Sequence, residues 1–421
     1  MPATTRRWLI VLALFVVTSA ISVPLAAYGV FLPVLAETFG WTRGAISTAL
    51  SINLLLGGAA GFALGALADR HGPRGVLVVT VVMAGVAFGC VSTVSALWQL
   101  YLLVGVMGGV GMSTFYLLSA STVARWFEER RGLALALVLI GFNVAYISAG
   151  PLAAWLIAHV GWRAAYALLG GGGGLIAMLA ALTVRLPRPE EAKAIRGGGA
   201  AAGAHAMSGG SVPAPVVSVT LGQALADVRQ WVLNLSWLLL GGLTFMINVH
   251  IVPFARDQGI SLAAASLALT AYGLGSMTGR LTAGALSDRV GALTTLRAGY
   301  VVQLLGLLAL LWAPSYQALL LALAVFGAGF AATDTMFVKA IPDVFGMGAL
   351  GAIMGILSLG WRSGAAAGPA AAGFLHDLTG SYAVSFGAAP IIVLASWALF
   401  ALASSRRGRR PDRAATTART E

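Results

Sequence analysis

The chain has 421 residues, of which 59% are hydrophobic and only 10% are charged. No soluble globular fold can bury that much apolar surface, so the composition excludes this class and indicates a helical membrane protein. The formal net charge of +12 comes from basic residues at the ends of apolar runs, a pattern that argues against nucleic-acid binding. The single cysteine, Cys90, excludes a disulfide framework.

The first apolar run follows Arg6 and Arg7 and begins like a signal peptide. It continues from residue 8 to about residue 36, longer than a signal sequence requires, so we expect an uncleaved membrane span. Eleven more apolar segments follow. The twelve expected spans are about 8–36, 45–67, 76–94, 97–124, 132–158, 163–185, 231–255, 262–287, 293–313, 316–341, 347–376 and 381–404.

These spans predict four parts of the chain. Residues 1–185 form an amino-terminal six-helix bundle, and residues 231–405 form a carboxy-terminal one. Between them, residues 186–230 form a cytoplasmic linker rich in Gly, Ala and Pro, with a flexible tether at 197–215 and a short amphipathic helix at Thr220–Gln230. Residues 406–421 form a basic cytoplasmic tail.

Basic residues fix the expected orientation. Of the 26 Lys and Arg residues, only Arg43, Arg163 and Arg256 fall in loops on one side of the twelve spans, and two more fall within spans. The other 21 lie at the termini and in the loops of the opposite side. The positive-inside rule therefore predicts a multi-pass membrane protein with both termini in the cytoplasm. The membrane that we expect is a bacterial-type inner (plasma) membrane.

The chain repeats itself. GALADRHG at 65–72 matches GALSDRVG at 284–291 with an offset of 219 residues, and Gly150-Pro151 matches Gly368-Pro369 with an offset of 218. Matches in the same order at a nearly constant offset predict two homologous six-helix halves.

The repeated loops carry a charged pair. Asp69 and Arg70 occupy the first copy, and Asp288 and Arg289 the second, each at the expected cytoplasmic end of a span. Small residues beside them allow close helix packing. We predict that these four residues form a conformational latch that holds the two halves in one state; the alternative is an ordinary charged loop.

These motifs resemble those of a known family. GALADRHGPRG (65–75) resembles the signature loop of the major facilitator superfamily. RWFEERRGLALAL (125–137), YGLGSMTGRLTAGALSDR (272–289) and YGVFLPVLAETFGW (28–41) are similar to segments of the monocarboxylate transporter family, with the oxalate-formate exchanger branch as a near relative. The resemblance implies an all-α membrane protein whose twelve transmembrane helices form two pseudo-symmetric six-helix bundles. A central cavity between them would work by alternating access.

Arg280 is a charge inside an apolar span. It lies eight residues before Asp288, which places it about 12 Å deep, where a charge is costly. Gly61 occupies the equivalent position in the first half, so the charge is not shared by both copies. Tyr272, Ser276 and Arg280 follow one another every four residues and form a polar stripe. We predict that Arg280 anchors a carboxylate, with a structural salt bridge as the alternative.

Asp334 is the clearest acidic residue within a span, and it aligns with Tyr116 of the first half. An aspartate at this depth can switch between protonated and ionised forms, so we predict a proton-coupling site, or else a static partner for Arg280 or Lys339. Animal monocarboxylate transporters usually carry an Asp where this chain has Ser276. His250 is a second candidate for proton coupling, with a hydrogen-bonded structural histidine as the alternative.

The orientation of Arg362, which the sequence does not determine, decides whether the predicted substrate is a monocarboxylate or a dicarboxylate. If it faces the cavity, two arginines favour a dicarboxylate, an arrangement that the oxalate-formate exchanger branch resembles. If it pairs with Asp334, a net site charge of about +1 suits a monocarboxylate. Further hydrogen-bonding candidates for the substrate are Tyr28, Tyr116, Asn143, Asn248 and Ser276.

The predicted function is secondary active transport of a small organic anion, most simply proton-coupled symport of a monocarboxylate such as lactate or pyruvate. The alternatives are exchange of an oxalate-like dicarboxylate, efflux of a drug or metabolite, and an anion sensor. The sequence has no GxxxxGK[ST] loop and no metal-ligand cluster, so we expect neither an enzyme nor a cofactor. The expected partners are the anion, protons and the lipid bilayer, and the monomer is the expected functional unit.

Overall fold

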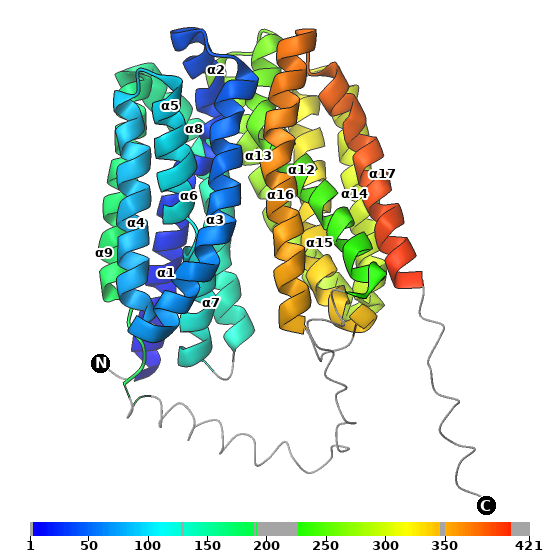
Figure 1. Ribbon diagram of the computed structural model, residues 1–421. Helices are drawn as coiled ribbons and strands as arrows, with labels where there is room; N and C mark the ends of the chain where they lie inside the picture. Colours follow the sequence, from blue (N-terminus) through cyan, green and yellow to red (C-terminus); the bar gives the residue numbers. More distant parts are fainter. Residues whose placement is uncertain (1–2, 128–129, 189–190, 192–225, 346–349, 406–421) are drawn as a thin grey trace, which may run out of the picture.

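The computed structural model describes residues 3–127, 130–188, 191, 226–345 and 350–405 (Figure 1). The predicted tail at 406–421 and the tether at 197–215 lie outside these ranges. Of the predicted amphipathic helix Thr220–Gln230, only the end is described, where helix α12 begins at Val228. Within the described residues, every regular element is helical.

The amino-terminal half consists of helices that are interrupted by kinks and short irregular segments. The fifth and sixth predicted spans, for example, are separated by a kink at Gly161, whose backbone has φ 77° and ψ 162°. The elements of this half are α1 (Ala3–Ala26), α2 (Tyr28–Phe39), α3 (Arg43–His71), α4 (Pro73–Cys90), η1 (Val91–Thr93), α5 (Leu97–Leu100), η2 (Tyr101–Met107), α6 (Gly108–Gly111), α7 (Phe115–Trp126), α8 (Arg131–Tyr166), η3 (Ala167–Gly172) and α9 (Gly173–Thr183).

The carboxy-terminal half consists of six longer helices. They are α12 (Val228–Asp257), α13 (Leu262–Val290), α14 (Ala292–Leu311), α15 (Tyr316–Phe345), α16 (Leu350–Thr379) and α17 (Ala383–Ser405). Eight helical stretches of the described chain are long and apolar enough to cross a membrane. One of these stretches, 132–183, contains two predicted spans that meet at the kink at Gly161. The predicted spans that are not among the eight stretches coincide with α5–α7, α13 and α16.

The internal repeat is visible in how helices begin and end. Thr42 caps α3 by accepting a hydrogen bond from the Ala45 amide at 3.3 Å, and Ser261 caps α13 in the same way from Ala264 at 3.3 Å. These caps are 219 residues apart. Gly72 and Gly291 then end the two helices with φ values of 89° and 86°, a conformation that favours glycine. The predicted similarity of the halves is thus present in the backbone.

The two halves stand side by side (Figure 1). Helix α3 packs against α16, α8 against α13, and α2 against α12, so each half contributes to the interface. The start of α1 and the end of α17 lie at one end of the bundle, and we call the opposite end, formed by the turns at 40–42, 258–261 and 380–382, the distal face. Hydrogen bonds and ion pairs between the halves gather toward this face, which closes the distal end of the interface.

Small residues set the spacing of the helices around the candidate site. A Cβ atom on Gly275 would overlap the backbone of Ala324, and one on Gly279 the backbone of Ala328, so α13 and α15 touch through their main chains. Gly275 and Gly279 therefore form the face through which α13 packs against α15. The close approach also brings the polar residues of α13 within reach of α15.

Candidate functional site

An ion pair joins the two charged residues predicted for the site. Arg280 of α13 and Asp334 of α15 lie with Nη2 and Oδ2 3.1 Å apart. Their side chains are 37% and 24% exposed, so neither charge is sealed within the core. The alternative partner considered for Asp334, Lys339, instead contacts Ser287 at 2.7 Å and Asp288 at 2.9 Å. The structural salt bridge considered as the alternative for Arg280 is therefore present, with both side chains partly exposed.

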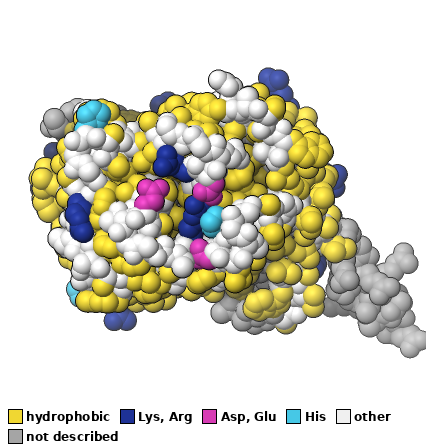
Figure 2. All heavy atoms as spheres, turned by 90° about the horizontal axis from the view of Figure 1, so that it is seen from above, with side chains coloured by type: hydrophobic (Ala, Val, Ile, Leu, Met, Phe, Trp, Pro, Cys, Tyr) yellow, Lys and Arg dark blue, Asp and Glu magenta, His cyan; other side chains and the backbone are white. Residues whose placement is uncertain are grey.

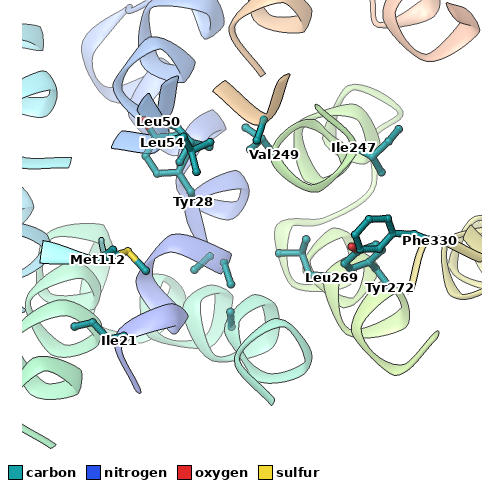
Figure 3. Close-up of a cluster of buried hydrophobic side chains, with 14 of the residues drawn as sticks. Ile21, Tyr28, Leu50, Leu54, Met112, Ile247, Val249, Leu269, Tyr272 and Phe330 are labelled. Carbon is teal, nitrogen blue, oxygen red and sulfur yellow. The ribbon is translucent and has the colours of Figure 1, made fainter. Parts of the chain in front are cut away.

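The polar stripe above Arg280 is buried. Tyr272 and Ser276 are 4% and 5% exposed, and the Ser276 hydroxyl has no hydrogen-bond partner within the described residues. Figure 3 shows Tyr272 beside Phe330 of α15, with ring centroids 6.1 Å apart in stacked geometry. A buried hydroxyl without a partner loses free energy unless a ligand or water satisfies it.

The predicted amides are also buried. Asn248 of α12 donates a hydrogen bond from Nδ2 to the Thr244 carbonyl at 2.9 Å, whereas its Oδ1 has no partner in the described part of the chain. Asn143 of α8 is 7% exposed. Asn248 Oδ1 and the Ser276 hydroxyl, which both neighbour the Tyr272 hydroxyl, therefore offer an acceptor and a donor that another molecule can contact.

The two tyrosine candidates differ. The Tyr28 hydroxyl donates to the Ile46 carbonyl at 2.6 Å, so in this conformation it is already used between α2 and α3. Figure 3 shows Tyr28 with Leu50 and Leu54 in the amino-terminal half, facing Val249 of α12. Tyr116 belongs to α7, but its side chain lies outside the described residues.

Arg362 of α16 lies against the other half. A Cβ atom on Gly58 of α3 would lie 3.0 Å from its Cδ, and one on Gly57 would lie 3.4 Å from its Nη1. No described acidic residue forms an ion pair with this guanidinium. Asp334 therefore does not pair with Arg362 here, because it pairs with Arg280. Arg280, Asp334 and Arg362 together carry a net charge of +1.

Aromatic side chains beside this charge set were not predicted. Trp361, next to Arg362, stacks on Phe330 with centroids 5.9 Å apart and lies 4.8 Å from the ring of Trp237. Trp237 in turn stacks on Phe337 at 4.0 Å. The sequence carried no usable signal for this stacking, because the contacts depend on how three helices meet.

His250 is fully buried and held on both ring nitrogens. Its Nδ1 lies 2.9 Å from the Tyr382 hydroxyl, and its Nε2 lies 2.8 Å from the Pro369 carbonyl and 3.3 Å from Ser47 Oγ of the other half. It is not in contact with the Arg280–Asp334 pair. This geometry fits the alternative of a structural histidine at the interface more closely than a proton relay.

Of the predicted latch residues, the three whose side chains are described form no ion pair between the halves in this conformation. Asp288 pairs with Lys339 of the same half, and Arg70 and Arg289 are exposed at the end of the bundle that carries the termini. The side chain of Asp69 lies outside the described residues. The latch stays a prediction, one that belongs to a conformation in which this end of the bundle is closed.

The described residues contain no group of three or more His, Cys, Asp or Glu side chains suited to a metal ion.

A family model described as Major Facilitator Superfamily matches residues 10–254 and 234–420. The chain belongs to this superfamily. Its predicted fold and its predicted family are confirmed, and it is a transporter rather than an enzyme.

The most similar relatives include named monocarboxylate transporters. Human monocarboxylate transporter 11 is 28% identical over 395 residues, covering 90% of this chain and 79% of the relative. Rat monocarboxylate transporter 13 is 25% identical over 397 residues, covering 92% and 86%. Among solved structures, a bacterial homologue of the human lysosomal transporter Spinster, inward-facing and unoccupied, has a TM-score of 0.76, with 15% identity and coverage of 95% and 97%. This major facilitator protein therefore shares its fold with a solved transporter and is similar in sequence to proteins named monocarboxylate transporters.

Proposed function

We propose that this major facilitator protein carries small monocarboxylates together with protons. The observation that carries the proposal is the partly exposed ion pair between Arg280 and Asp334 at 3.1 Å in a chain whose relatives are named monocarboxylate transporters. A guanidinium binds a carboxylate through two parallel hydrogen bonds, so a substrate can take the place that Asp334 occupies. A transferable proton on Asp334 makes that replacement favourable.

Charge balance provides the coupling. In the empty carrier, Arg280 and Asp334 neutralise each other. When Asp334 takes up a proton, Arg280 is left as an uncompensated cation within the membrane, a state that costs free energy until an anion binds. A carboxylate on Arg280 restores neutrality, so the carrier reorients either empty or with both proton and anion. Arg362 contributes the same charge in both states and does not alter this balance.

Two unpaired polar atoms support a substrate with a second polar group. Asn248 Oδ1 can accept a hydrogen bond and the Ser276 hydroxyl can donate one, and neither has a partner among the described atoms. A 2-hydroxy acid such as lactate, or a 2-oxo acid such as pyruvate, presents a group of this kind beside its carboxylate. Apolar neighbours such as Tyr272 and Phe330 would accommodate the small methyl group.

The proposed orientation follows from the basic residues. With the termini in the cytoplasm of a bacterial-type inner membrane, the distal face lies outside, and this conformation is closed to the outside. We propose that the monomer is the transporting unit, because each monomer carries its own Arg280–Asp334 pair.

Uptake into proteoliposomes tests the proposal. Labelled L-lactate should accumulate in response to an inward proton gradient, and pyruvate and acetate should compete. The matched controls are protein-free liposomes and proteoliposomes without a pH gradient. Lactate uptake that does not respond to the proton gradient would refute proton coupling.

A second candidate function rests on Arg362. Because it has no ion pair with a described residue, it is a second cation that an oxalate-like dicarboxylate could bind together with Arg280. Oxalate–oxalate exchange into preloaded vesicles, with no lactate uptake, would favour this function over monocarboxylate symport.

A further inference from the structure

A second cluster of charges lies at the distal face. Figure 2 shows basic, acidic and histidine side chains gathered near the centre of that face, surrounded by hydrophobic side chains. We call its core the distal cluster: Arg43 and Gly44 of α3, Asp257 of α12 and Asp377 of α16. None of these residues belongs to the site around Arg280.

The distal cluster consists of two carboxylates bound to one set of donors. The Arg43 guanidinium donates two hydrogen bonds to Asp257, with Nη1–Oδ2 and Nη2–Oδ1 distances of 2.7 Å and 2.6 Å. The amides of Arg43 and Gly44, at the start of α3, donate to the two oxygens of Asp377 at 3.0 Å and 2.8 Å. Both contacts have the bidentate geometry by which proteins recognise carboxylates.

Neighbouring groups hold these donors in place. Tyr382 lies under the Arg43 guanidinium, 5.3 Å from the ring centroid, and its hydroxyl lies 2.9 Å from Nδ1 of the buried His250. His376 contacts Asp257 at 3.3 Å. The Arg43 side chain is only 17% exposed, so its position is set by packing as well as by charge.

The donors and the carboxylates belong to different halves of the protein. Arg43 and Gly44 are in the amino-terminal half, whereas Asp257 and Asp377 are in the other. When the halves separate at the distal face, both carboxylates leave together. A guanidinium and two free amides then remain on one half, facing the opening and complementary to a carboxylate.

We propose that Arg43 and the first amides of α3 form an outer carboxylate-binding site. The protein's own Asp257 and Asp377 fill it while the distal face is closed, and a small carboxylate anion fills it when that face opens. An external carboxylate thus competes with Asp257 and lowers the cost of opening, which an anion without this planar geometry cannot do equally well. The identity of the anion rests on the proposed function, but the site itself does not.

Cysteine labelling tests the site without requiring transport. Leu50 is 1% exposed and lies beside Tyr28 and Leu54 on the side of the amino-terminal half that faces Val249, so a Leu50→Cys side chain should react with a membrane-impermeant maleimide only when the distal face opens (Figure 3). The exposed native Cys90 is first removed as Cys90→Ser. Arg280→Ala is added to every variant, so that binding at the central site cannot account for the result.

In this background, external L-lactate should accelerate labelling at least about threefold over chloride at equal ionic strength. When Arg43→Gln is added, the Leu50→Cys thiol should react rapidly in both salts, because this change removes both the ion pair that closes the face and the carboxylate site. Asp257→Asn should also label faster, yet it should keep its response to lactate because Arg43 remains. The matched control is Glu37→Gln, which removes the longer and more exposed pair with Arg256 at 3.6 Å; it should accelerate labelling less than Asp257→Asn and keep the full response to lactate.

Two outcomes would overturn the proposal. Equal labelling rates in lactate and chloride would contradict the proposed carboxylate site. Slow labelling of both Arg43→Gln and Asp257→Asn would contradict the proposed role of the cluster in closing the distal face. Failure of the proposed function would look different: uptake assays would detect no carboxylate transport, while the labelling of Leu50→Cys would still respond to lactate through Arg43.

Discussion

Arg280 and Asp334 form their ion pair within one half of a protein built from two similar halves. The equivalent positions in the amino-terminal half are Gly61 and Tyr116, which carry no charge. A pair needed only for helix packing would be expected in both copies, since α3 and α13 begin and end alike. The asymmetry favours a role in binding, and the following predictions depend on it.

Replacing Arg280 by Ala should abolish carboxylate uptake. The change removes the anion's partner and leaves Asp334 without its own, and losing one member of such a pair costs about 2–5 kcal/mol, or at least about 30-fold in kcat/KM. Arg280→Lys should recover only part of the activity, because an ammonium cannot bind bidentately. The control is Arg297→Ala, at an exposed position of α14, assayed at a matched protein level. Normal uptake by Arg280→Ala would contradict the role of Arg280 as the anion anchor.

Replacing Asp334 by Asn should separate anion binding from proton movement. The amide cannot ionise, so Arg280 stays unpaired and only the anion-loaded carrier can reorient: lactate exchange between loaded vesicles should persist, whereas net uptake driven by the proton gradient should be lost. The measurement is uptake at a series of external pH values for Asp334→Asn and for Asp288→Asn. The second variant breaks the 2.9 Å pair with Lys339 and should keep the wild-type pH profile. Identical profiles for wild type and Asp334→Asn would rule out Asp334 as the proton site.

Replacing Arg362 by Gln should distinguish the two candidate functions. If the substrate is a monocarboxylate held by Arg280, Arg362→Gln should retain lactate uptake within about tenfold, since only a long-range attraction is lost. If the substrate is a dicarboxylate, the same variant should lose oxalate exchange. Its elution profile in size-exclusion chromatography should match that of the wild type, which shows that the protein is folded.

Helix packing in the amino-terminal half should be sensitive at one glycine and tolerant at a near neighbour. A Cβ atom on Gly174 of α9 would overlap the Gly85 backbone of α4, whereas one on Gly172 meets no atom within 4 Å. Gly174→Val should therefore destabilise the protein by about 1–3 kcal/mol through overpacking, and Gly172→Val by much less. Thermal unfolding in detergent measures both, and equal melting temperatures would contradict the packing.

The sequence predicted the fold because the signals of a membrane chain are local. Long apolar runs mark spans, and the repeat of GALADRHG at GALSDRVG required only comparison of the chain with itself. It predicted Arg280 and Asp334 as well, because charges inside apolar runs are rare. It left the partner of Asp334 open among Arg280, Lys339 and Arg362, because pairing depends on how α13, α15 and α16 are rotated about their axes.

The distal cluster could not be predicted for a related reason. Arg43 and Asp257 are 214 residues apart and lie at helix ends, where charged residues are ordinary. Only the docking of the two halves brings them together. The stacking of Trp237, Phe330 and Trp361 likewise depends on three helices meeting, and single aromatic residues in apolar spans give little warning of it.

The most direct test of coupling through Arg280 and Asp334 measures lactate and protons together. Proteoliposomes that contain a pH-sensitive dye receive an outward-to-inward gradient of labelled L-lactate with no initial pH difference. Wild-type protein should acidify the interior in proportion to lactate uptake, and Asp334→Asn, in vesicles preloaded with unlabelled lactate, should exchange lactate without acidification. Lactate entry through the wild type with no internal acidification would contradict the central claim.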